Sequence, residues 1–192
     1  AGRGAAADGP GPGVTRQGGP VGQHGSVHTD RLRIPVPVRW ADLDAYGHVN
    51  NVAVFTLLEE ARIAAFWRQD PAEAGTGVGG GQAPPTAVLD AGPGSDTVTV
   101  VARQEIEYLA PIPHVREPVV VELWLGRLGD ASIDVCFEVT AGAGAARQVF
   151  VQAATTVVLL DAATNRPRRL TDEERAVWAP LVGPPVAWRR RP

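Results

Sequence analysis

Residues 51–68 read NVAVFTLLEEARIAAFWR, and their apolar side chains recur every three or four positions. This is the spacing of one face of an α-helix, so the sequence predicts a helix over 51–68. Glu59 and Arg62 fall off the apolar face. A helix this apolar is expected to be enclosed on several sides. The apolar face is formed by Val54, Leu57, Leu58, Ala61 and Ala65, and it is widened by Phe55, Ile63, Phe66 and Trp67.

A strand is predicted before this helix. Over residues 32–40, apolar residues alternate with arginine or proline, and strict period two is typical of a half-buried strand. Pro35 and Pro37 fall on the outward set, which favours an edge strand. The inward set is Leu32, Ile34, Val36, Val38 and Trp40.

Four further strands are predicted after a Gly/Pro-rich connection over 69–96, in which 86–90 could form a short strand. Gly129-Asp130 is a hairpin turn signal. One strand, one buried helix and then antiparallel strands indicate an α+β domain. In the first of these strands, over 97–109, one face is expected to carry Val98, Val100, Ala102, Ile106 and Tyr108. The four strands cover 97–109, 119–125, 133–139 and 148–160.

The segments outside these elements differ in composition. Residues 1–29 are Gly/Pro-rich with no Leu, Ile or aromatic residue, which predicts a disordered tail. The domain is expected over 30–183, with a helical end from about residue 171, where Thr171 and Glu174 form a capping box. Residues 184–192, which contain three consecutive arginines, are expected to be a flexible tail.

Composition excludes several classes of function. The chain has 192 residues, 44% of them hydrophobic, and a net charge of −3, so no basic surface for nucleic acid is indicated. No apolar run is long enough to span a bilayer. The single cysteine, Cys136, excludes an internal disulfide and a cysteine-based zinc site, and it is expected to be a buried or interface thiol. One thiol suits a reducing cytoplasm, which is the expected location.

The chemistry is expected between the first strand and the helix. Residues 40–51 read WADLDAYGHVNN, which places two carboxylates, a histidine and two asparagines before an apolar helix. A helix N-terminus has unpaired N–H groups and a partial positive charge, which can stabilise a developing oxyanion. A nearby carboxylate could act as a base or a nucleophile.

These residues also fit structural roles. Asn50 or Asn51 could be the N-cap of the helix. Asp42 or Asp44 could bond its own backbone in an Asx-turn, and Gly47 could only supply a positive φ. A divalent metal held by the two aspartates and the histidine is the least favoured alternative, so no metal site is predicted.

Residues 38–51, followed by LEEAR at 58–62, resemble the hotdog-fold acyl-CoA thioesterases of the 4-hydroxybenzoyl-CoA thioesterase type. EIEYLAP at 105–111 resembles the family's long central strand, and VVLLD at 157–161 resembles its closing strand. The resemblance covers about 32–167. It implies a hotdog fold, in which one long central helix is wrapped by a curled antiparallel sheet of five or six strands.

The resemblance also implies an activity and an assembly. The expected reaction is hydrolysis of an acyl-CoA thioester to a free carboxylic acid and coenzyme A, without metal or organic cofactor. Such enzymes are homodimers or homotetramers with active sites at the subunit interface. Alternatives are an acyl-carrier-protein thioesterase, a non-catalytic acyl-CoA-binding module on the same fold, and a hotdog hydratase or dehydratase.

The family's catalytic carboxylate maps onto Asp44, as nucleophile or as base for water. The backbone N–H groups at the helix start, near Asn50–Val52, would polarise the thioester carbonyl. Some members carry a histidine where this chain has Asn51, whereas here His48 lies three places earlier. Both are therefore candidates for a second catalytic group.

Two tyrosines, Tyr46 and Tyr108, are candidates for the acyl pocket, although Tyr108 equally fits a core position with its hydroxyl at the edge. Arg103, Arg116 and Arg127 could meet coenzyme A phosphates, since arginine suits bidentate phosphate contacts.

Overall fold

The computed structural model describes residues 31–68, 83–90, 92, 94–114, 116–142 and 146–189. The predicted tail 1–29 lies outside these residues. The described elements are β1 (Leu32–Val36), α1 (Asn51–Phe66), β2 (Thr97–Tyr108), β3 (Val119–Leu128), β4 (Ser132–Ala141), β5 (Gln148–Asp161), β6 (Arg166–Pro167) and α2 (Asp172–Trp178).

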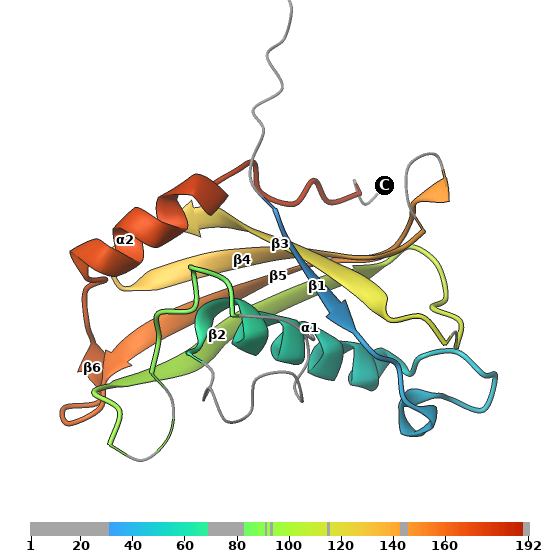
Figure 1. Cartoon of the computed structure of the whole chain (residues 1–192), viewed down its shortest axis with the longest axis horizontal. Helices are drawn as coiled ribbons and strands as arrows, with labels where there is room; N and C mark the ends of the chain where they lie inside the picture. Colours follow the sequence, from blue (N-terminus) through green and yellow to red (C-terminus); the bar gives the residue numbers. More distant parts are fainter. Residues whose placement is uncertain are drawn as a thin grey trace, which may run out of the picture.

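The strands form one antiparallel sheet in the order β1-β3-β4-β5-β2, with β6 paired to the end of β5 (Figure 1). The predicted α+β class is confirmed, and so is an antiparallel sheet of five or six strands, since six are present. The hairpin at Gly129-Asp130 is confirmed too, with the Gly129 N–H donating to the Ser132 carbonyl at 2.9 Å. Both edges of the sheet, β1 and β2, carry no further strand among the described residues.

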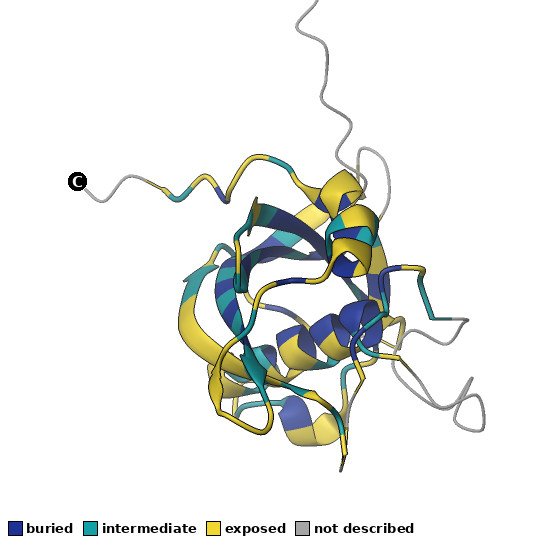
Figure 2. Ribbon diagram, turned by 90° about the vertical axis from the view of Figure 1, so that its left-hand side faces the viewer, coloured by how far each residue is buried: buried dark blue, intermediate teal, exposed yellow. Residues whose placement is uncertain are grey.

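Helix α1 lies along one face of the sheet, which we call the inner face, and the sheet curls past it (Figure 2). The five residues of its predicted apolar face are all buried and join the core of the inner face. Arg62 is buried as well, against the prediction, while Ile63 is 46% exposed. The helix is therefore enclosed on fewer sides than its composition predicts, and its Ile63 side stays open.

The first strand ends earlier than predicted. β1 stops at Val36, and Trp40 begins a turn of 3-10 helix over Trp40–Asp42 instead of continuing the alternation. Trp40 is 78% exposed, so its assignment to the inward set is wrong. The reason is local, because the Asp42 carboxylate accepts from the Arg39 N–H at 2.8 Å and turns the chain.

Strand β2 changes face at a bulge, which the alternation did not predict. Val100 is opposite Val158, and Ile106 is opposite the buried Ala153, but the register shifts between Val101 and Arg103. One extra residue in a strand exchanges the two faces beyond it. Val98 and Val100 therefore lie on the outer face, whereas Ile106 and Tyr108 lie on the inner one. The predicted strand at 86–90 is absent from the described part, where Leu89 makes only a single bridge to Trp67.

Helix α2 packs its buried side chains against the end of α1. Thr171 caps α2 with the predicted capping box, and Trp178 is fully buried with its ring 5.5 Å from that of Phe66. Beyond α2, residues 184–189 lie against the outer face of the sheet, unlike the flexible tail expected there.

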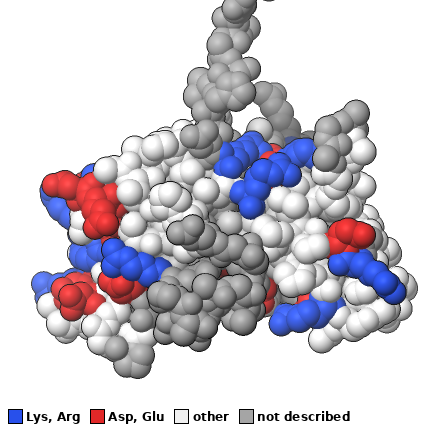
Figure 3. Space-filling view, in the orientation of Figure 1, with Lys and Arg blue, Asp and Glu red and all other residues white. Residues whose placement is uncertain are grey.

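No helix within the described ranges has the length and apolarity to cross a membrane. On the face seen in Figure 3, acidic and basic side chains lie next to one another.

Candidate functional site

A tight turn precedes α1. Leu43 and Val49 bridge its two sides, and the Gly47 N–H donates to the Asp44 carbonyl at 3.2 Å. Gly47 has φ +76°, and no atom lies within 4 Å of the position that a Cβ would take. The glycine is therefore required by the backbone conformation rather than by crowding. The turn is fastened to the segment after β2, because the Val49 N–H donates to the Ile112 carbonyl at 2.9 Å.

The Asp44 carboxylate is bound to the backbone of the turn through one of its own oxygens. Its Oδ1 accepts from the N–H of Tyr46 at 2.8 Å and from that of His48 at 3.1 Å. Its Oδ2 has no partner among the described residues, and the residue is half-buried. Asp44 thus forms the Asx-type turn that its residue type allows, and it also presents one oxygen for chemistry.

Asp42 is held much more firmly. It is buried, and its carboxylate accepts from the Arg39 N–H and, at 2.9 Å, from the Arg39 guanidinium. Hydrogen bonding to Arg39 lowers the pKa of this carboxyl. Arg39 also lies 3.9 Å from Glu60 on α1. Asp42 therefore braces the turn against the helix.

The start of α1 shows which asparagine is the cap. The Asn50 side chain accepts from the Val52 N–H at 2.8 Å, so Asn50 is the N-cap. Its own N–H donates to the Asp42 carbonyl at 2.8 Å. Of the N–H groups near Asn50–Val52 that were expected to face a substrate carbonyl, those of Asn50 and Val52 are therefore occupied within the fold. The Asn51 N–H has no partner among the described residues.

Tyr108 joins the end of β2 to the start of α1. Its hydroxyl donates to the Asn51 carbonyl at 3.0 Å, and partial burial raises its pKa. Both residues line a cavity of about 320 Å³ whose other walls are mostly apolar. These walls are Val49, Val54, Leu109, Ala110, Pro111 and Ile112.

A second cavity, of about 230 Å³, lies farther along α1 and is bounded by β2, β4 and β5. Val52 lines it, together with Phe55 and Arg62. Burial lowers the pKa of Arg62, and its guanidinium lies 3.3 Å from Glu59. The periodicity of the sequence predicts Arg62 off the apolar face of the helix, whereas in the structure its side chain is buried.

The structure thus brings some of the predicted residues together. Asn51 and Tyr108 share the first cavity, and Val52 lines the second. Asp44 and His48 lie in the turn beside the helix start and line neither cavity. Tyr46 is 85% exposed at the tip of this turn.

Two contacts near the turn were missed. Trp40 stacks on His114 with ring centroids 4.1 Å apart, and His48 pairs through its backbone with Pro113. The repeated prolines at 111 and 113 were the only sequence signal that this segment leaves β2 to meet the turn.

The arginines expected near coenzyme A differ in their surroundings. Arg103 pairs with Glu105, and Arg127 pairs with Asp134 at 2.7 Å. Arg116 is exposed. Cys136 is buried, as predicted. Among the described residues, no three His, Cys, Asp or Glu side chains gather into a group that could hold a metal ion.

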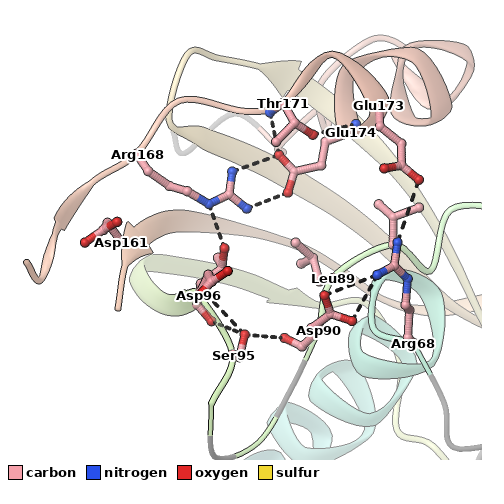
Figure 4. A pocket seen from close by; sticks show the side chains of 12 residues that line it. Arg68, Leu89, Asp90, Ser95, Asp96, Asp161, Arg168, Thr171, Glu173 and Glu174 are labelled. Atoms are coloured by element: carbon pink, nitrogen blue, oxygen red, sulfur yellow. Dashed lines mark hydrogen bonds and ion pairs between the residues drawn. The ribbon is translucent and has the colours of Figure 1, made fainter. Parts of the chain in front are cut away.

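A third cavity, of about 340 Å³, lies at the other end of α1 (Figure 4). Its charged side chains bond to one another across the cavity. Arg168 pairs with Glu174, and Arg68 pairs with Asp90 at 3.0 Å and with Glu173 at 3.7 Å. Such mutual pairing is typical of a structural junction.

Comparison with known proteins identifies the family. A model of the thioesterase-like superfamily matches residues 38–178. A thioesterase from Thermus thermophilus, solved with coenzyme A and zinc, is 30% identical, with TM-score 0.55 over 80% of this chain and 96% of that one. Comparison with curated proteins gave no match.

Two other solved structures show the same fold at lower identity. YbaW, a probable thioesterase from Escherichia coli, is 24% identical, with TM-score 0.54 over 80% of this chain and 98% of that one. The 1,4-dihydroxy-2-naphthoyl-CoA thioesterase Slr0204 from Synechocystis is 15% identical, with TM-score 0.55 over 78% and 96%. With a family match over most of its length and this fold, the chain belongs to the thioesterase-like superfamily.

Proposed function

We propose that this protein is an acyl-CoA thioesterase of the hotdog type, which hydrolyses a thioester to a free acid and coenzyme A. The observation that carries the proposal is the Asp44 carboxylate, fixed through Oδ1 by two backbone N–H groups with Oδ2 left open. It lies in the turn that leads into α1. Membership of the thioesterase-like superfamily supports the reaction class.

Asp44 can act in either of two ways. As a nucleophile, Oδ2 attacks the thioester carbonyl carbon, the C–S bond breaks, and the thiolate of coenzyme A leaves. Water then attacks the resulting anhydride and restores the carboxylate. As a general base, Asp44 takes a proton from water while the water oxygen attacks the same carbon. The C–S bond then breaks, and the proton passes from Asp44 to the departing sulfur. In both routes the products are the acid and the thiol.

The start of α1 would stabilise the oxyanion. In the first turn of a helix the N–H groups lack intrahelical partners and carry a partial positive charge of about half a unit. Because Asn50 and Val52 already use their N–H groups, the Asn51 N–H is the donor we assign to the thioester oxygen. The side chains of Asn51 and His48 are assigned to hold the attacking water.

The remaining residues are assigned to substrate binding. Tyr108 and the 320 Å³ cavity would receive the part of the acyl group next to the carbonyl. Val52 would face the rest of the acyl group in the second cavity. Tyr46, on the exposed tip of the turn, would contact the thiol arm of the donor, and Asn50 would act through the cap that fixes Val52.

We further propose that the protein is at least a homodimer that pairs through β2. This edge strand has twelve residues with no neighbour on one side among the described ones. Unpaired edges favour association, and Val101 and Tyr108 on this strand are both more than 40% exposed. Light scattering should give at least twice the chain mass of 20.2 kDa, and the mass of one chain at micromolar concentration would contradict the proposal.

The activity is tested by release of free thiol from a panel of acyl-CoAs, followed with a thiol-reactive dye after the protein's own Cys136 has been allowed for. The same acyl groups on an acyl carrier protein form the second arm. Faster release from coenzyme A supports the proposal, whereas release only from the carrier protein favours the alternative donor. Binding without release would favour a non-catalytic module.

The two routes are separated by one turnover in ¹⁸O water with enzyme in excess. Attack of water on the Asp44 carbonyl of an anhydride places ¹⁸O in the Asp44 carboxylate, which mass spectrometry of the peptide detects. General-base catalysis leaves that peptide unlabelled, and so does attack of water on the acyl carbon of the anhydride. Hydroxylamine, which traps an anhydride at Asp44, separates these last two cases. The cytoplasmic location expected from the single cysteine stays a prediction.

A further inference from the structure

The segment after α2 crosses the outer face of the sheet, and we call residues 184–189 the C-terminal strap. It begins at β3, where the Gly183 N–H donates to the Leu125 carbonyl at 2.9 Å and the Trp124 indole donates to the Pro184 carbonyl at 2.7 Å. In Figure 1 this segment leaves α2 and runs above the sheet toward the end marked C. The family match ends at Trp178, so the strap lies outside it.

The strap then meets the other strands in order. Val186 is buried against Trp124 and Cys136, which covers β3 and β4. The Ala187 carbonyl accepts from the Gln152 side chain of β5 at 3.2 Å, and the Arg189 N–H donates to Glu107 of β2 at 3.3 Å. Four strands span about 14 Å from first to last, and five extended residues span about 17 Å, so the strap runs roughly at right angles to the strands.

Glu107 is the point where strap, β5 and β2 converge. The Gln152 side-chain amide donates both to the Glu107 carboxylate and to the Ala187 carbonyl. The Arg189 N–H donates to the same Glu107 oxygen. Glu107 directly precedes Tyr108, whose hydroxyl holds the carbonyl of Asn51 at the start of α1. A connected series of bonds therefore leads from the strap to the site.

We propose that the C-terminal strap holds the end of β2 on the sheet and thereby positions Tyr108 at the start of α1. The activity part of this proposal rests on the proposed thioesterase function. Glu107, Gln152 and Arg189 are positioning residues in it, because they act through Tyr108.

The physical reason is that β2 is the last strand of the sheet within one chain, where its end has β5 as its hydrogen-bonded neighbour among the described strands. In the proposed dimer a second copy lies beside β2 in the plane of the sheet, whereas the strap covers its outer face. Strand ends open at lower free energy than strand centres. The strap adds bonds from a second direction to the residue next to Tyr108. Its loss should let the end of β2 move, and the Tyr108–Asn51 bond should then be made for a smaller part of the time.

The first experiment compares two truncations. One ends at Gly183 and removes the strap, and its matched control ends at Arg189 and keeps it. Cys136 is 1% exposed under Val186, so its reaction with a thiol-reactive dye reports strap opening. Removing the strap should speed this reaction on the order of 100-fold, since several hydrogen bonds and one apolar contact are lost. The control should react like the full chain.

The second experiment keeps the full chain and changes Glu107. Glu107→Ala should raise amide hydrogen exchange at residues 107–110 and lower kcat about fivefold, with KM within twofold, because about one net hydrogen bond is lost. Glu107→Gln keeps an acceptor oxygen and should restore most of kcat. Glu105→Ala, on the same strand and face but paired with Arg103 rather than with the strap, should leave exchange and kcat unchanged.

Unchanged exchange at 107–110 in Glu107→Ala overturns the proposal, and so does unchanged dye reaction in the folded Gly183 truncation. A fall in kcat of equal size in Glu105→Ala also overturns it. If the full chain hydrolyses no thioester, the proposed function fails, while dye reaction and hydrogen exchange still decide the role of the strap.

Discussion

The two ends of α1 are built in opposite ways. At its C-terminal end, Phe66 is buried against the fully buried Trp178, and Arg68 pairs with acidic side chains of the neighbouring segments (Figure 4). At its N-terminal end Asn51 is exposed. Among the described residues, neither the Asn51 N–H nor the second carboxylate oxygen of Asp44 has a hydrogen-bond partner. The closed end satisfies its polar groups within the chain, and the open end is where the proposed function places the substrate.

This difference shows how one helix can serve stability and chemistry at once. A helix end whose N–H groups have no partner lacks the hydrogen bonds that would otherwise stabilise it. The opposite end then has to hold the helix in place, and it does so with an aromatic contact and paired charges. Substitutions at the closed end should therefore change stability, and those at the open end should change turnover.

The largest effect is expected at the closed end. Trp178→Ala removes a fully buried indole and its hydrogen bond to the Thr86 carbonyl, which should lower the free energy of unfolding by about 3–5 kcal/mol. Urea unfolding followed by circular dichroism measures this. Trp178→Phe keeps a ring against Phe66 and should lose less. Equal stability of Trp178→Ala and the unchanged protein would contradict the closed-end interpretation.

The next effect is expected at the open end. Asp44→Asn keeps the oxygen that accepts from Tyr46 and His48, but it removes the negative charge and the basicity. Turnover should fall at least ~10²-fold, the usual range for losing such a group, while stability stays nearly unchanged. The measurement is kcat on the best acyl-CoA of the panel. A folded variant with near-normal turnover would refute the role of Asp44.

Asp42 lies two residues away and should behave like the closed end. Asp42→Asn weakens the charged bonds to Arg39 and should cost about 1–2 kcal/mol of stability at neutral pH, with a small effect on turnover. The folded pKa of Asp42 lies below its unfolded value, so this stability is present above about pH 3.9 and is lost as pH falls through the folded pKa.

The difference in stability between Asp42→Asn and the unchanged protein should therefore shrink in acid. Unfolding curves at neutral pH and below pH 4 test this. Full inactivation by Asp42→Asn alone, in a folded protein, would reverse the assignment of the two aspartates.

The smallest effect is expected at the cap of α2, which carries Trp178. Thr171→Ala removes the oxygen that accepts from the Glu174 N–H at 3.1 Å and should cost about 1 kcal/mol. Thr171→Ser keeps the oxygen and serves as the control. A loss as large as that of Trp178→Ala would show that the cap, and not the indole, holds the closed end.

Periodicity predicted the elements of the fold well, because burial imposes it. The helix starts at Asn51 as predicted and ends two residues earlier than expected, where Trp67 turns to an extended conformation and bridges to Leu89. Alternation failed where the backbone changed register. The bulge between Val101 and Arg103 exchanges the faces of β2, and no residue type in that run signals it.

The candidate site was predicted from the polar run 40–51 and from the family resemblance, which assigned the chemistry to Asp44 rather than Asp42. Alternation alone could not separate the two aspartates. The structure adds how each is held, because Asp42 is bonded on both oxygens and Asp44 on one. The strap could not be predicted either. Residues 184–189 read PPVAWR, whose prolines and lack of period predict no element, and tertiary contacts such as those of Val186 and Ala187 hold them on the sheet.

The backbone conformation of Gly47 suits an amino acid of the opposite handedness. Its φ of +76° is a conformation that L-residues rarely adopt, but the space around the missing Cβ is empty. A mirror-image alanine, introduced by chemical ligation, would adopt this φ naturally. It should leave the Asp44 turn intact and stabilise the fold by about 0.4–1 kcal/mol, because the unfolded chain loses freedom. Ordinary L-alanine at the same position should strain the turn.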